Sequence, residues 1–388
     1  MASVVLLMLG VGGAIARPRG TPAWVAPTVA AVVALALGTV AHPDTLLRPL
    51  AAPIAFLIVA VPFAALADRL GFFAAAAALA GRGRHLALGL WILAALVTTV
   101  LNLDASVVLL TPLYVRIARR CGLDPLALGF QPVLLACLAS SALPVSNLTN
   151  LIAASALHLD PAAFVAHLGV PSLAATTVGW FAYRAVLRPG VPAPAVVAGE
   201  ADRRPLIVGG AVVAAVLVGF VAGPGVGVPE WVVALAADVA LIAVTGHVPV
   251  RDIPWGTALV AASLGLLAGA AAAHIHLDRL LAGGSNLDLL RVTAVSAVGA
   301  NVVNNLPALL VALPHTGIGI WALLLGVNVG PLVLVTGTLA ALLWQASLAR
   351  LDVDVTAAQF ARIGVRVLLP SLSAAFIVLI ALRPVVGG

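Results

Sequence analysis

Long apolar runs with short polar islands inside them are the feature that most restricts how this chain folds. Apolar runs of roughly membrane-spanning length recur from one end of the sequence to the other,. Only 9% of the 388 residues are charged, whereas a soluble domain carries roughly 25%. The sequence therefore predicts an all-α polytopic protein of the plasma (inner) membrane.

The first polar island, Asn102-Leu103-Asp104, lies in the middle of an apolar run at about 86–115. Arginines precede and follow this run, at positions 82, 84, 116, 119 and 120. Because arginine accumulates on the cytoplasmic side of membrane proteins, both ends of the run are expected inside the cell. We therefore predict a re-entrant hairpin that enters and leaves from the inner side.

A second island, residues 301–307, interrupts the run at about 289–314, where Arg291 is the one arginine near either end. This run predicts a second hairpin with an outer base. Two further runs, at about 126–157 and 318–348, are broken internally by proline, glycine and small polar residues. Unwound backbone at membrane depth is tolerated only where protein or a watery cavity receives it.

Together these features predict two inverted repeats, residues 1–190 and 206–388, joined by a cytoplasmic linker at 191–205. Each repeat would carry three spans, a hairpin, a broken helix and a final span. Inverted repeats with discontinuous helices at the midplane are typical of secondary transporters. The sequence contains no lysine, which excludes an ATP-binding loop of the Walker type. We expect a transporter rather than an enzyme.

The polar islands supply the candidate substrate ligands. Amide and hydroxyl groups donate and accept hydrogen bonds, so they can hold a polar substrate without a fixed charge. Taken singly, each of these side chains could equally serve only to join helices. The predicted substrate-binding residues are Asn102, Ser146, Asn147, Thr149, Asn150, Asn301, Asn304, Asn305, Asn328, Thr336, Gly337 and Thr338.

Two acids lie deep inside apolar runs, Asp104 and Asp238. A carboxylate within a membrane segment is costly and usually has a task. Asp104 is the first candidate for binding a coupling proton or cation, and Asp238 is either a relay or a structurally paired acid. The expected coupling ion is H⁺, with Na⁺ as the alternative. Cys121 and Cys137 have no metal-ligand spacing, and we expect neither a metal site nor a cofactor.

The segments 102–112 and 304–308 resemble the two hairpin signatures of the arsenical pump membrane proteins (arsenite permeases), and 325–344 is similar to their last broken helix. That family belongs to the ion transporter superfamily, with the divalent anion/sodium symporters. The resemblance implies inverted repeats, an elevator-like motion and a homodimer. Dicarboxylate relatives carry Ser-Asn-Thr motifs at the hairpin tips. Only the asparagine is kept here, which argues against a dicarboxylate substrate.

The sequence thus predicts a proton-coupled secondary transporter that exports arsenite or antimonite. The alternatives are a sodium/proton antiporter that uses Asp104 and an organic-anion symporter of the same superfamily. A membrane scaffold or receptor that transports nothing is a further alternative, against which the midplane polar islands argue. An ATPase partner could energise export, and no nucleic-acid partner is expected because arginine near span ends is explained by membrane topology.

Overall fold

The computed structural model describes residues 1–17, 20–79, 83–191, 203–272 and 274–386, and throughout these ranges the regular structure is helical. Arg82 and residues 192–202 of the predicted linker lie outside the described residues. Six of the described helical segments are long and apolar enough to cross a membrane: 43–69, 83–100, 161–187, 203–222, 250–272 and 357–385. The predicted all-α polytopic membrane protein is confirmed.

The elements follow one another in the same order in both halves. The first half contains α1 (Ala2–Ala16), α2 (Val25–Ala36), α3 (Pro43–Arg69), α4 (Phe72–Leu79), α5 (Leu86–Val100), α6 (Leu103–Arg120), α7 (Pro125–Gly129), α8 (Gln131–Leu138), α9 (Leu148–Leu157), α10 (Pro161–Phe164) and α11 (Val170–Leu187). The second contains α12 (Arg203–Ala222), α13 (Glu230–Thr245), α14 (Trp255–Ala272), α15 (Asp278–Leu281), α16 (Asn286–Val303), α17 (Asn305–Ala312), α18 (Ile320–Val329), α19 (Leu339–Ala349) and α20 (Ala357–Val386).

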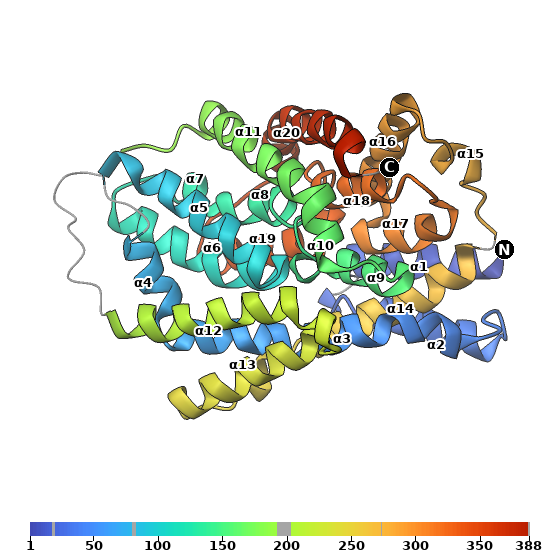
Figure 1. Ribbon diagram of the computed structural model, residues 1–388, viewed down its shortest axis with the longest axis horizontal. Coiled ribbons are helices and arrows are strands. Elements are labelled where there is room, and N and C mark those ends of the chain that lie inside the picture. Colours follow the sequence, from blue (N-terminus) through green and yellow to red (C-terminus); the bar gives the residue numbers. More distant parts are fainter. Residues whose placement is uncertain (18–19, 80–82, 192–202, 273, 387–388) are drawn as a thin grey trace.

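The helices form two layers, with a pair of long helices along one edge (Figure 1). The lower layer consists of α1–α3 and α12–α14, in which α3 packs against α13 and α14. The layer above it contains the interrupted helices α5–α9 and α16–α19, and α6 packs against α19. Helices α11 and α20 pack together along the upper edge. The interrupted helices are thus enclosed between continuous ones.

The two helical pairs α5–α6 and α16–α17 enter this middle region from opposite ends of the molecule. In Figure 1, α4 and the start of α5 lie toward the left end, and α15 and the start of α16 lie toward the right end. Each pair contacts itself along its length and turns near the centre. The turns therefore bring polar residues from both halves of the chain into the interior.

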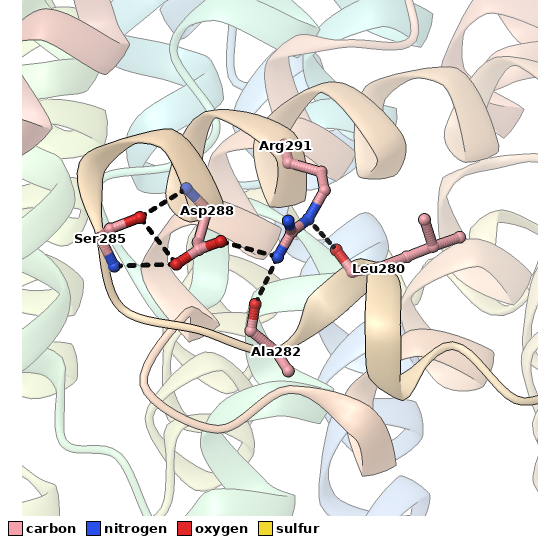
Figure 2. Close-up of polar contacts among 5 residues, drawn as sticks. All are labelled: Leu280, Ala282, Ser285, Asp288 and Arg291. Carbon is pink, nitrogen blue, oxygen red and sulfur yellow. Dashed lines mark hydrogen bonds and ion pairs between the residues drawn. The ribbon is translucent and has the colours of Figure 1, made fainter.

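A polar cluster fixes the base of α16 (Figure 2). The Ser285 hydroxyl accepts a hydrogen bond from the Asp288 N–H at 3.2 Å, and the Asp288 carboxylate accepts one from the Ser285 N–H at 3.1 Å. Arg291 pairs with Asp288 at 2.9 Å and donates to the carbonyls of Leu280 and Ala282 at 3.1 and 2.7 Å. Reciprocal capping of this kind stabilises a helix start. The arginine beside the second hairpin is therefore engaged in holding the α15–α16 connection.

Candidate functional site

The first helical turn-back lies at Asn102, between α5 and α6. The Asn102 side chain accepts a hydrogen bond from the Asp104 N–H at 2.8 Å and so caps the start of α6. Asparagine is among the best residues for this position, because its side-chain oxygen satisfies a helix N–H that has no partner within the helix. The Thr98 hydroxyl donates to Ser106 at 2.8 Å and joins α5 to α6 just behind the turn.

The second turn-back lies at Asn304, between α16 and α17. Its backbone has φ 79°, a left-handed conformation that asparagine tolerates better than most residues,. The Asn304 side chain accepts from the Leu306 N–H at 3.3 Å and donates to the Thr336 carbonyl at 3.0 Å. The second tip is therefore capped like the first, and it is also tied to the interruption between α18 and α19.

The two broken helices resume in the same way. Asn147 caps α9 by accepting from the Thr149 N–H at 3.2 Å. Thr338 caps α19 by accepting from the Ala341 N–H at 3.0 Å. Residues 139–147 and 330–338, which precede these helices, contain only short helical turns. Each half of the chain thus contributes two helix starts that are formed by a polar cap within an apolar segment.

All four helix starts border one cavity of about 60 Å³. The first residues of α6, α9, α17 and α19 form one side of it, and α1 and α14 form the other. The N-terminus of a helix carries a partial positive charge and N–H groups that favour oxygen acceptors. The residues lining the cavity are Val11, Ala14, Ile15, Ala23, Leu103, Asp104, Asn147, Leu148, Thr149, Thr257, Val260, Leu264, Val303, Asn304, Asn305, Leu306, Thr338, Leu339 and Leu342.

Asp104 is the one charged residue among those lining the cavity. Its Oδ1 is buried and has no hydrogen-bond partner in the described part of the chain. No arginine or histidine lines the cavity. The charge of a deprotonated Asp104 therefore lacks a basic partner there and is opposed only by the partial charges of the helix starts. Such a carboxylate gains from binding a proton or a small cation.

Behind the cavity, Asn328 of α18 holds the start of α9. Its carbonyl oxygen accepts from Asn147 Nδ2 at 3.1 Å and from the Thr149 hydroxyl at 2.8 Å, and its Nδ2 donates to Asn150 Oδ1 at 2.7 Å. Asn150 in turn donates to the carbonyls of Ser140 and Leu143. Asn328 and Asn150 do not line the cavity. They position the residues that do.

Asn301 has a corresponding role in the other half. Its Nδ2 donates to the Gly330 carbonyl at 2.9 Å, and its Oδ1 accepts from the N–H groups of Val333 and Leu334, both at 3.0 Å. It thereby binds the unwound backbone between α18 and α19 to α16. Ser146 acts similarly in the first half, donating to the Thr99 carbonyl at 2.6 Å.

The structure thus divides the predicted site residues into two groups. Those that reach the cavity are Asp104, Asn147, Thr149, Asn304, Asn305 and Thr338. Those that lie outside its lining are Asn102, Ser146, Asn150, Asn301, Asn328, Thr336 and Gly337. Asp238 is also outside it: this acid is buried in α13, a lower-layer helix that packs against α3, and its Oδ1 has no partner in the described chain.

Sequence reasoning missed the opposite wall of the cavity. Thr257 and Val260 of α14 and Val11, Ala14 and Ile15 of α1 line it. These helices are ordinary apolar segments without a polar island. Nothing in their local sequence distinguishes a wall of the cavity from a surface facing lipid.

The chain matches the sequence profile of a transporter family, described as "Citrate transporter", over residues 4–337. The chain belongs to this family. It is also 28% identical to an arsenical pump membrane protein of Yersinia enterocolitica over 417 residues, covering 95% of each chain. An arsenical pump membrane protein of Escherichia coli (strain K12) is 28% identical over 422 residues, covering 94% of each. The resemblance to arsenite permeases drawn from the hairpin motifs is thus confirmed, and with the apolar helices it identifies a multi-pass transporter of the inner membrane.

Proposed function

We propose that the protein is a proton-coupled secondary transporter that exports arsenite or antimonite. The observation that carries this proposal is the cavity bordered by four helix starts and a single unpaired carboxylate. The names of the relatives support the choice of substrate, because the arsenical pump membrane proteins match nearly the whole chain.

The size and chemistry of the cavity favour a small solute with little charge. A volume of about 60 Å³ corresponds to roughly four times the space that one water molecule needs,. Arsenite at neutral pH is mainly an uncharged trihydroxide, and amide, hydroxyl and helix N–H groups suit its oxygens. No cysteine lines the cavity, so binding would rest on oxygen contacts rather than on thiolates.

An organic-anion symporter is the second candidate, and the description of the matching family favours it. Four helix starts would attract a carboxylate. Against it stands the cavity lining, in which the one charged side chain is an acid and no arginine is present. A citrate trianion would meet the Asp104 carboxylate without a basic residue to bind it.

Asp104 is the proposed coupling site. In the loaded carrier, a proton on Asp104 removes the cost of an unpaired carboxylate in an apolar interior. We further propose that α5–α9 and α16–α19 move together against α1–α3 and α12–α14, as in an elevator, because the cavity lies where these layers meet. The predicted inverted repeats, 1–190 and 206–388, would relate the inward and outward states by exchanging equivalent conformations.

Transport into inside-out membrane vesicles tests this function. Arsenite uptake should be driven by an imposed proton gradient, and uptake of citrate should not. Asp104→Asn should abolish the response to the gradient while leaving arsenite exchange down its own gradient. Asp252→Asn, which changes an exposed acid of the loop before α14, is the matched control and should behave as wild type. Gradient-driven citrate transport without arsenite transport would replace the proposal by the second candidate.

A further inference from the structure

A second cavity adjoins the first beside α1 and α19. It has a volume of about 450 Å³ and lies between the end of α1, the second half of α19 and the segment that follows α19. Ile15 and Leu342 line both cavities. The two spaces are therefore neighbours, and these two apolar side chains lie where they meet.

The lining of the second cavity is suited to a polar solute. Arg17, Gln345 and Asp354 contribute a guanidinium, an amide and a carboxylate, while Ala16 and Ala346 keep the space open. The Arg17 Nε is buried and has no hydrogen-bond partner in the described chain. A buried donor without a partner is costly, and a solute oxygen or water would relieve that cost. Since both signs of charge are present, the lining does not select a strongly charged anion.

The position of this cavity places it on the cytoplasmic side. Arg17 lines it, and Arg350 follows α19 directly at its edge. Arginines at the ends of spans mark the inner side of a membrane protein. Arg119, in the last turn of α6, donates to the Leu351 carbonyl and so joins the inner end of the first hairpin to the same segment.

We propose that this second cavity, here called the access vestibule, is the cytoplasmic mouth of the transport route. Ile15 and Leu342 form the barrier between it and the substrate cavity. Ile15 belongs to the lower layer and Leu342 to the layer of interrupted helices. A movement of one layer against the other therefore changes the separation of these side chains and opens or closes the barrier. The nature of the solute rests on the proposed function, but the route itself does not.

Cysteine labelling tests the route without any transported substrate. In inside-out vesicles and a background lacking Cys121 and Cys137, an impermeant methanethiosulfonate reagent reaches the cytoplasmic face. Ala16→Cys, in the access vestibule, and Ala14→Cys, in the substrate cavity, should both be labelled. Adding Leu342→Trp should slow labelling at position 14 by about ten-fold or more, because a larger side chain fills the barrier of a close-packed interior.

The controls separate a blocked route from a damaged protein. Leu342→Trp should change labelling at position 16 by less than about two-fold, since that cysteine lies before the barrier. Leu342→Ala should accelerate labelling at position 14, and Ile15→Trp should repeat the block from the other side. Unchanged labelling at position 14 in both tryptophan variants, or labelling at that position only from the external face, would overturn the proposal. Failure of arsenite transport in the wild type would overturn the proposed function and leave this result unaffected.

Discussion

Removing the Asn328 side chain should destabilise the protein, although that side chain lies outside the cavity. Asn328→Ala takes away one acceptor that serves two donors and one donor that serves Asn150. A buried polar group left without a partner costs about 1–3 kcal/mol. Asn147 and Thr149 border the cavity, where water can replace part of the loss, whereas Asn150 is fully buried. We therefore expect a total loss of about 2–4 kcal/mol in the free energy of unfolding.

Thermal unfolding in detergent measures this effect. A loss of that size should lower the apparent melting temperature by about 2–5 °C in a chain of this length. Asn286→Ala is the matched control, because it makes the same chemical change on an exposed side chain and should alter stability by less than about 0.5 kcal/mol,. The start of α9 should also loosen, so substrate affinity should fall even though Asn328 does not touch the cavity.

A double-mutant cycle identifies the cause. Thr149→Val alone removes one hydrogen bond to Asn328 and should cost about 1 kcal/mol,. In the Asn328→Ala background the same change should cost clearly less, because its partner is already gone. Equal melting temperatures for Asn328→Ala and Asn286→Ala, or fully additive effects of the two changes in the cycle, would refute the assignment of Asn328 as the residue that holds α9.

Three further predictions follow from single contacts. Gly364→Ala should lower stability by about 2–3 kcal/mol, seen as reduced yield and melting temperature, because a Cβ there would lie 1.6 Å from the Leu332 carbonyl oxygen. Hydrogen bonds from the hydroxyl and N–H of the residue that precedes α16 hold the pKa of Asp288 below its ordinary value, so its stabilisation is present above the unfolded pKa and is lost as pH falls through the folded one; hydrogen exchange in the α15–α16 connection should rise on acidification in the wild type, and Asp288→Asn should show the faster exchange already at neutral pH. Cys121, and a cysteine at His85 in a background without the native cysteines, should both react with an impermeant thiol reagent only from the cytoplasmic face; reaction of one of them from outside would replace the hairpin α5–α6 by a simple span.

The sequence predicted the class of protein and the places where helices are interrupted because both are local properties. An apolar run of given length, or an asparagine set within one, has the same consequence for the backbone in any surroundings. Asn102 and Asn304 could therefore be recognised as helix breaks from the residues around them, and both cap helices in the folded chain. The confirmed membrane class and family depended on signals of this kind.

Which polar groups face the cavity was decided only by tertiary packing. Asn147 and Asn150 belong to the same short polar stretch, yet the first lines the cavity and the second is buried against the backbone of residues 140–143. The direction of each side chain depends on the rotation of α9 against α18, which no local pattern specifies. The apolar wall from α1 and α14 and the barrier of Ile15 and Leu342 likewise exist only because segments more than 200 residues apart in the sequence meet. Hydrophobicity determines where the chain enters the membrane, but contact between distant helices determines what its polar groups can bind.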